Sequence, residues 1–229
     1  GTQCNPYFFS VYQNDTYDEA AGVVANENGY KNVVIIAPNY PAGKDHLGGF
    51  KRTYTGKVSE EIYTRVGQLD YAAELAQIRS AQPDAVFFFL PGAMGINFIK
   101  QFKAAGLDNV KLVAPGFSAD QDVINAVGEA MVGLQNTAHW THDLDNEANK
   151  KFVADYKQKF NRYPAVYAAQ AYDVIMSLDA AVREVKGEVD NKEAVIAALR
   201  KADFASVRGP FTYGTNQYPI QDYYLRVIE

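Results

Sequence analysis

The chain has 229 residues, of which 48% are hydrophobic and 21% charged, with a net charge of −5 and a pI near 5.3. This length is typical of one or two globular domains, and the composition predicts an ordinary hydrophobic core. No basic surface is evident, which argues against a nucleic-acid partner. No apolar run approaches the roughly 20 residues that cross a bilayer, so the chain is not expected to span a membrane. The single cysteine, Cys4, cannot form an internal disulfide.

The first half of the chain alternates short β-branched runs with segments of helical period. Helices are predicted at 15–29, 43–54, 70–81, 95–105 and 119–127. Strands are predicted at 32–38, 58–64, 86–90, 110–114 and 131–137. The run from 32 to 38 is apolar after Asn32, which is typical of a strand buried on both faces. The alternation predicts an α/β fold with a parallel sheet and helices on both faces.

The pattern changes near residue 138. Three consecutive helices are predicted at 145–160, 165–186 and 190–202, followed by strands at 210–213 and 223–228. Three helices cannot bury their apolar faces against one short strand pair. The second half is therefore expected to pack on the first half or on strands that this chain does not contain. The apolar run at 7–11, so close to Gly1, favours a missing amino-terminal segment.

Three of the predicted strands lead into loops made of small residues, a proline and one aromatic, Met or hydroxyl side chain. These strand–loop segments are 33–43, 85–95 and 111–118, and each is followed by a helical pattern. Ligands of open α/β sheets bind at the carboxyl ends of parallel strands. The three loops therefore predict one wall of a ligand cleft.

The segment 116–120 partly matches the nucleophile elbow G-x-S-x-G, but its last position is aspartate. A simpler interpretation is that Ser118 or Asp120 caps the following helix. An α/β hydrolase that uses Ser118 stays as the alternative from another functional class. Since no Ser/His/Asp set and no carboxylate pair converges, we expect no catalytic residue, no cofactor and no enzymatic reaction.

His139 and His142, which are followed by Asp143 and Asp145, are candidate metal ligands. Zinc sites need three or four converging ligands, and helical histidine pairs are spaced four apart rather than three. A capping role for Asp145 or Asn146 is the simpler interpretation, and no metal is expected. Neither the phosphate-loop motif nor G-x-G-x-x-G is present, so nucleotide binding is not expected either.

Six segments, in this order, are similar to those of type I periplasmic solute-binding proteins of ABC transporters, whose best-known members bind branched-chain amino acids. They are 8–15, 39–45, 70–75, 83–88, 98–107 and 171–173. The resemblance covers essentially the whole chain, and the subgroup it resembles most captures aromatic carboxylates such as hydroxybenzoates and phenylpropenoates. It implies two α/β lobes, joined by three crossover strands, that close on the ligand like a hinged trap. It also implies a periplasmic location and delivery of the ligand to an ABC transporter permease.

The resemblance further implies a domain organisation. Residues 1–14 would be a remnant of the first lobe and a crossover, 15–137 the second lobe, 138–214 the later part of the first lobe, and 215–229 a strand returning to the second lobe. Family members are longer at the amino terminus. The first lobe is therefore expected to be incomplete in this chain.

Ligand contacts are implied at positions that match the family's three loops and its crossovers. They are Tyr40 and Ala42 in the first loop, Pro91, Gly92 and Met94 in the second, Gly116, Phe117 and Ser118 in the third, and Tyr12, Asp15 and Trp140 near the crossovers. Loop packing is the alternative for Phe117 and Met94. Hinge packing and capping are the alternatives for the crossover residues.

The third loop decides the ligand class that the resemblance implies. Amino-acid binders of this family carry an acidic residue there, which pairs with the ligand ammonium, whereas residues 116–118 include no carboxylate. A buried ammonium without a partner is costly. This favours a ligand without an amino group, with an aromatic ring against Phe117 and Met94. A branched-chain or other amino-acid binder of the same family, or a sensor with the same fold, stays as the alternative.

Overall fold

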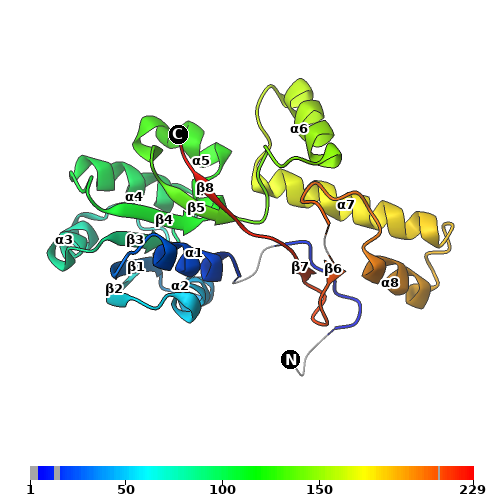
Figure 1. Cartoon of the computed structure of the whole chain (residues 1–229), viewed down its shortest axis with the longest axis horizontal. Coiled ribbons are helices and arrows are strands. Elements are labelled where there is room, and N and C mark those ends of the chain that lie inside the picture. The colour runs from blue at the N-terminus through cyan, green and yellow to red at the C-terminus, as the bar shows by residue number, and fades with distance from the viewer. Residues whose placement is uncertain (1–4, 13–15, 211) are drawn as a thin grey trace. The chain divides into compact units, whose positions relative to one another are not determined.

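A computed structural model describes residues 5–12, 16–210 and 212–229 (Figure 1). Cys4 and Asp15 lie outside the described residues. The chain forms two compact units, each discontinuous in sequence. The first unit comprises Gly1–Gln13 and His139–Asp222, and the second comprises Asn14–Ala138 and Tyr223–Glu229.

The second unit is built on a sheet with the strand order β2-β1-β3-β4-β5-β8. The strands are β1 (Asn32–Pro38), β2 (Lys57–Thr64), β3 (Ala85–Phe88), β4 (Lys111–Pro115), β5 (Gln135–Ala138) and β8 (Tyr224–Val227). Strands β1 to β5 pair in parallel, and β8 pairs antiparallel to β5. The mostly parallel sheet with helices on both faces confirms the predicted α/β fold.

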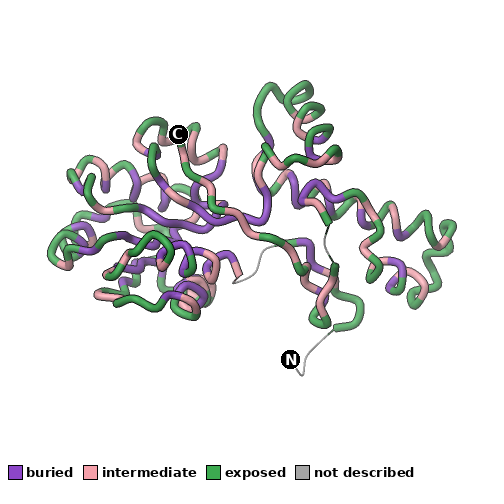
Figure 2. Tube along the Cα trace, in the orientation of Figure 1, coloured by how far each residue is buried: buried purple, intermediate pink, exposed green. Residues whose placement is uncertain are grey.

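Helices cover both faces of this sheet (Figure 1). They are α1 (Thr16–Glu27), α2 (Pro41–Thr53), α3 (Ala72–Ala81), α4 (Ala93–Ala104) and α5 (Gln121–Val127). Leu47 and Phe50 of α2 pack with Ile35 on one face, whereas Phe98 of α4 packs with Ile36 on the other. Strand side chains alternate between faces, and helices cover both faces here. Residues of β1 beyond Asn32 are therefore apolar, and they are buried (Figure 2).

Two predicted elements around residues 116–137 are shorter than the sequence indicated. Gly116–Ala119 forms a 3-10 turn, so the helix begins at Gln121 rather than 119, and a second 3-10 turn precedes β5. Gly128 and Gly133 have φ angles of +71° and +86°, which favour glycine and end regular structure there. Asp120 occupies the N-cap position of α5, but its side chain makes no capping hydrogen bond.

The first unit contains the helices α6 (Glu147–Phe160), α7 (Val166–Glu184) and α8 (Lys192–Lys201) and a hairpin of β6 (Thr212–Tyr213) and β7 (Pro219–Ile220). Asn146, one of the two predicted capping residues, caps α6 by accepting a hydrogen bond from Asn149 N at 2.8 Å. The sequence-based division assigned 215–229 to the second lobe. In the structure only Tyr223–Glu229 clusters there. Because β7 pairs with β6, the chain as far as Asp222 belongs to the first unit.

Helix α7 exposes most of its large apolar side chains. Val174, Ile175 and Leu178 are 39%, 63% and 45% exposed, whereas Asp173 and Ser177 are buried. A helix at the surface of a complete globular domain normally has the opposite arrangement. The first unit therefore lacks a complete core around α7 within the described residues.

The polar buried face of α7 carries a buried ion pair. Asp173 accepts hydrogen bonds from Ser206 Oγ at 2.6 Å, Val207 N at 3.1 Å and Arg208 Nε at 2.8 Å. Arg208 also donates through Nη1 to the Val11 carbonyl at 3.0 Å. The side chains of Asp173 and Arg208 are 0% and 1% exposed. The pair thus joins α7, the loop after α8 and the amino-terminal segment of the first unit.

Tyr71 is a fully buried tyrosine of the second unit whose hydroxyl donates to the Gln68 carbonyl at 2.8 Å. Burial, and to a smaller degree the negative charge of Glu74, raise the pKa of the Tyr71 phenol well above its usual value. The unfolded chain releases this proton near pH 10, but the folded chain retains it. Tyr71 therefore stabilises the fold below about pH 10, and this contribution is lost as the pH rises further.

We expect Tyr71→Phe to flatten the loss of stability above about pH 10, since the slope is about 1.4 kcal/mol per pH unit for each retained proton. Near neutral pH the same change removes a hydrogen bond worth about 1 kcal/mol. Urea unfolding measured from about pH 8 to pH 11 tests both effects. Tyr7→Phe, at an exposed position, is the control. An unchanged alkaline slope in Tyr71→Phe would contradict the expectation.

Candidate ligand-binding surface

The three predicted loops lie at one edge of the sheet in the second unit. Strands β1, β3 and β4 are adjacent and parallel, so their carboxyl ends share this edge. The first loop follows β1 and leads into α2, the second follows β3 and leads into α4, and the third is the 3-10 turn after β4. Such an edge is the usual ligand position in open α/β sheets.

An aromatic cluster connects the first and third loops. The Tyr40 ring stacks on Phe89 with centroids 6.3 Å apart, and Phe89 meets Phe117 edge to face at 5.7 Å. Tyr17 of α1 lies 6.2 Å from Phe117 and meets Tyr223 edge to face at 5.5 Å. Sequence reasoning missed Phe89, Tyr17 and Tyr223. Strand alternation was the signal for Phe89, because it places this ring on the α1–α2 side of the sheet.

His46 of α2 belongs to the same aromatic cluster and was also missed. Its ring stacks on Phe89 with a centroid distance of 3.7 Å and an interplanar angle of 22°, and it meets Phe117 edge to face at 5.7 Å. Its Nδ1 lies 2.6 Å from Oδ2 of Asp18, whose side chain is completely buried. The His46 side chain is 16% exposed. No motif connects residues 18 and 46 in the sequence, so only the packing of α1 against α2 shows this pair.

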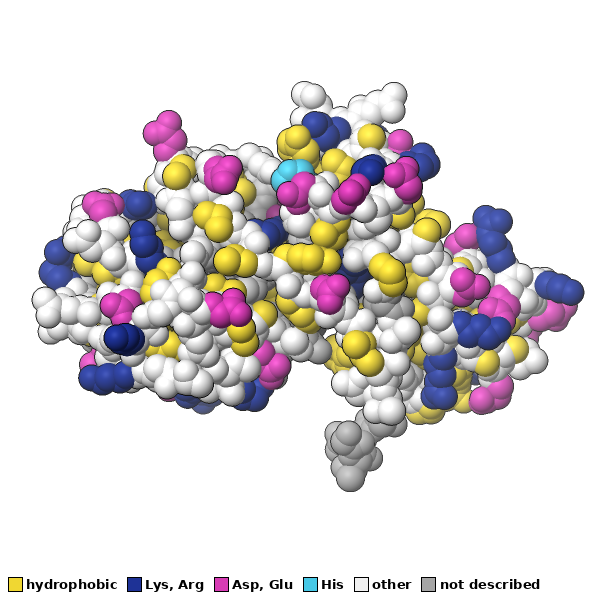
Figure 3. All heavy atoms as spheres, in the orientation of Figure 1, with side chains coloured by type: hydrophobic (Ala, Val, Ile, Leu, Met, Phe, Trp, Pro, Cys, Tyr) yellow, Lys and Arg dark blue, Asp and Glu magenta, His cyan; other side chains and the backbone are white. Residues whose placement is uncertain are grey.

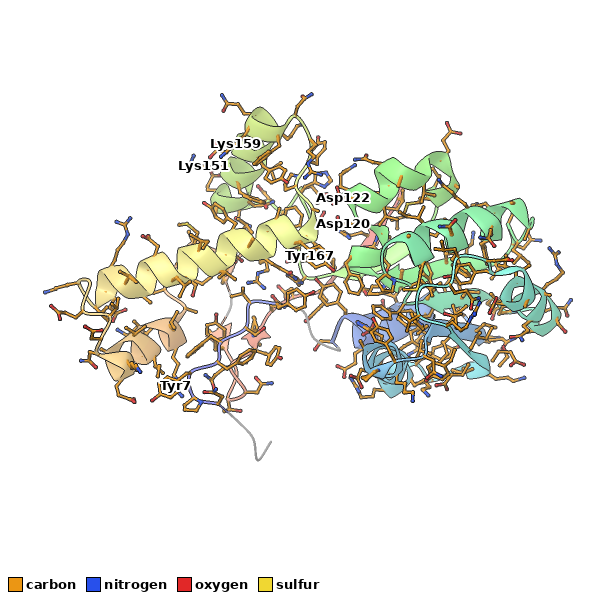
Figure 4. All side chains as sticks on the ribbon, turned by 180° about the vertical axis from the view of Figure 1, so that it is seen from behind. Tyr7, Asp120, Asp122, Lys151, Lys159 and Tyr167 are labelled. Atoms are coloured by element: carbon orange, nitrogen blue, oxygen red, sulfur yellow. The ribbon has the colours of Figure 1, made fainter. Side chains whose placement is uncertain are left out.

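The third loop is held in place by the last strand. Arg226 of β8 donates to the Gly116 carbonyl at 2.9 Å and to Asn136 Oδ1 at 2.7 Å. Its Nη1 lies 3.6 Å from a carboxylate oxygen of Asp120, which is labelled in Figure 4. A Cβ at Gly116 would lie only 2.8 Å from Cβ of Ala138, so this close packing requires glycine.

Ser118 is only 3% exposed, and its Oγ has no hydrogen-bond partner among the described residues. Buried hydroxyl groups normally have a partner. Because no described histidine bonds this oxygen, the geometry offers no general base for a serine nucleophile. A ligand contact at Ser118 stays a prediction.

The second loop divides its predicted contacts between two environments. Pro91 is half-buried and Gly92 is exposed, with a φ of +61° at the start of α4. Met94, by contrast, is buried in the α3–α4 core, and its sulfur accepts from Gly67 N at 3.2 Å. Met94 and Phe117 lie on opposite faces of the sheet, so the structure does not bring them together. Ala42 packs beside the core that contains Phe89.

Two of the predicted contacts lie in the first unit. Tyr12 is 48% exposed, and its ring stacks on Tyr167 at 6.3 Å (Tyr167 is labelled in Figure 4). Trp140 is 1% exposed, and its indole N–H donates to Asn149 Oδ1 at 2.7 Å. Asp15, the third crossover residue, lies outside the described residues. A ligand role for these three residues stays a prediction.

Among the described residues, no group of three or more His, Cys, Asp or Glu side chains is arranged to hold a metal ion. His139 is 1% exposed, whereas His142 is at the surface. In the described parts of the chain, no helix has the length and apolar character needed to cross a membrane. Charged side chains of both signs are interspersed on the face shown in Figure 3.

Comparison with known proteins identifies the family. A family model described as periplasmic binding protein matches residues 1–229. The chain belongs to the periplasmic binding protein family. Its solved relatives include ABC transporter solute-binding proteins, which confirms both the resemblance stated from the sequence and the type I fold.

Two solved structures illustrate the similarity of this periplasmic binding protein to aromatic-acid binders. A solute-binding protein from R. palustris, solved with benzoate, is 34% identical with a TM-score of 0.93, and the match covers 99% of this chain and 63% of that one. A second, from Rhodopseudomonas palustris BisB5 and solved with 3,4-dihydroxy benzoic acid, is 32% identical with a TM-score of 0.81. That match covers 94% of this chain and 61% of the other.

A curated relative points to a different ligand class. The Leu/Ile/Val-binding protein homolog 6 of Brucella melitensis is 28% identical over 217 residues, which cover 90% of this chain and 55% of that protein. This periplasmic binding protein chain therefore spans a little over half the length of that relative, and less than two thirds of the two solved structures.

Proposed function

We propose that this protein is an extracytoplasmic solute-binding protein that captures a small aromatic carboxylate, of the hydroxybenzoate or phenylpropenoate type, for an ABC importer. The observation that carries the proposal is the aromatic cluster at the carboxyl edge of the sheet. Its rings come from separate segments of the chain and include Tyr40 and Phe117 at the predicted loops. Aromatic rings favour stacked or edge-to-face packing, so this surface suits a flat ring. We propose a periplasmic location and a permease partner on the basis of the family.

The charges beside the cluster disfavour a ligand ammonium. The third loop contributes no carboxylate between Gly116 and Ser118. Two nearby carboxylates face cationic or imidazole groups: Asp120 lies 3.6 Å from Arg226, and Asp18 lies 2.6 Å from His46. An ammonium group buried here would have to compete for one of them, which costs free energy. A ligand without an amino group avoids that cost.

Ser118 supplies a polar group for such a ligand. Its buried Oγ can donate a hydrogen bond to a ligand carboxylate, and none of the described residues uses it. Binding pockets for small molecules commonly combine a mostly apolar lining with a few such polar groups. Tyr40 adds a phenol whose pKa is raised by burial, so it remains a neutral hydrogen-bonding group at ordinary pH.

The relatives support the proposal and also define the alternative. Two of them were solved with benzoate and with 3,4-dihydroxy benzoic acid. The name of the Brucella relative favours a second candidate, the binding of a branched-chain amino acid. The aromatic cluster and the third loop without an acid distinguish the two candidates, since leucine brings an ammonium and no ring.

Isothermal titration of the protein at its full encoded length, with 4-hydroxybenzoate, p-coumarate and leucine, tests the proposal. We expect heat of binding with the aromatic acids and none with leucine. Leucine binding without any response to an aromatic acid would overturn the ligand assignment and leave the amino-acid alternative.

We further expect Phe117→Ala to weaken aromatic-acid binding at least tenfold. Loss of a ring contact costs on the order of 1–3 kcal/mol. The matched control is Phe160→Ala, because Phe160 is an exposed phenylalanine of the first unit outside the proposed surface. Equal dissociation constants for Phe117→Ala and the unmodified protein would remove Phe117 from the binding surface.

A further inference from the structure

His46 combines two features that its neighbours in the aromatic cluster lack. One ring nitrogen, Nδ1, lies 2.6 Å from the fully buried carboxylate of Asp18. No described residue hydrogen-bonds the other nitrogen, Nε2, and the side chain retains 16% exposure. The ring is therefore anchored on one side, and its second polar atom remains available on the other.

The contact with Asp18 determines which nitrogen of His46 donates a hydrogen bond and which accepts one. A carboxylate only accepts hydrogen bonds, so Nδ1 is the donor toward Asp18, and in the neutral imidazole Nε2 is then an acceptor. Stacking on Phe89 and edge contact with Phe117 hold the ring plane in addition. An acceptor oriented in advance by a buried partner loses little entropy when a ligand donor reaches it.

A ligand ring that packs on the half-buried Phe117 would lie beside His46, which meets Phe117 edge to face at 5.7 Å, whereas Phe89 is only 3% exposed. The proposed ligands differ in their ring substituents, and a phenolic hydroxyl is a hydrogen-bond donor whereas a ring C–H is not. We propose that Nε2 of His46 accepts a hydrogen bond from a ring hydroxyl, so that the protein prefers hydroxylated benzoates over benzoate. This inference rests on the proposed function. It makes His46 the residue that distinguishes hydroxylated benzoates from benzoate.

The test compares the dissociation constants of benzoate, 3-hydroxybenzoate and 4-hydroxybenzoate in the protein at its full encoded length. We expect the better hydroxylated ligand to bind about fivefold to tenfold more tightly than benzoate, the effect of one neutral hydrogen bond. In His46→Phe the ring stacking is kept but the acceptor is lost, so this ratio should fall to about one. A purely structural role for His46 would weaken all three ligands together and leave the ratio unchanged.

Asp45→Asn is the control, because Asp45 is the exposed neighbour of His46 on α2 and should leave the ratio unchanged. If His46→Phe does not fold, His46→Met makes the same test, since a thioether is only a weak acceptor. A ratio that survives in these His46 variants, or a preference of the unmodified protein for benzoate, overturns the inference while the proposed function stands. Binding of leucine but of none of the benzoates overturns both.

Discussion

Asp173→Asn is expected to lower the free energy of unfolding of the first unit by about 3–5 kcal/mol, the cost of leaving one partner of a buried ion pair uncompensated. Arg208 is 1% exposed, and its guanidinium would then face a neutral amide instead of a carboxylate. Ser206 Oγ and Val207 N would also lose their charged acceptor.

Urea unfolding followed by far-UV circular dichroism measures the effect of Asp173→Asn. Asp179→Asn is the matched control on the same helix, since Asp179 pairs at 2.7 Å with a well-exposed Arg183 and should leave the unfolding midpoint unchanged. The double variant Asp173→Leu with Arg208→Met removes both charges and should recover part of the loss. A midpoint shift no larger in Asp173→Asn than in Asp179→Asn would contradict the expectation.

Gly43→Ala is expected to destabilise the second unit by about 3 kcal/mol, the upper end of the cost of overpacking. A Cβ at Gly43 would lie 2.0 Å from the carbonyl oxygen of Pro38, a backbone atom that cannot swing aside. The first turn of α2 would have to move away from the end of β1. Because Tyr40 and His46 flank this contact, the same change should also weaken ligand binding.

Gly48 gives a control for Gly43 in the same helix. A Cβ at Gly48 meets no atom within 4 Å, so Gly48→Ala should stabilise the unit by up to about 1 kcal/mol through helix propensity alone. Opposite signs in thermal or urea unfolding are therefore expected from two chemically identical substitutions. A stabilising Gly43→Ala would show that α2 can shift at little cost.

The sequence predicts this fold well where local patterns determine it. The apolar run at 32–38 became β1 with the same limits, and Asn146 caps α6. The three loops meet at one sheet edge because strand–helix alternation forces a parallel sheet. Such features depend on residues that are close together in the chain, so the pattern that specifies them can be read from a single sequence.

The remaining features depend on residues far apart in the chain. Asp18 and His46 are 28 positions apart, and Arg226 reaches Gly116 across 110 positions. Met94 shows a related limit: its loop position was predicted, but whether its side chain enters the core on one face or the other depends on the turn of α4. Nothing local to these residues specifies their partners.

The late position of β8 in the chain has a consequence for biosynthesis. The segment Tyr223–Glu229 belongs to the second unit, yet it leaves the ribosome only after the whole of His139–Asp222 has been made. Until then β5 pairs only with β4 and is an edge strand, and the Gly116 carbonyl lacks its hydrogen bond from Arg226. The aromatic surface is therefore completed last. A nascent chain that ends before β8 lacks the Arg226 side chain that holds the third loop.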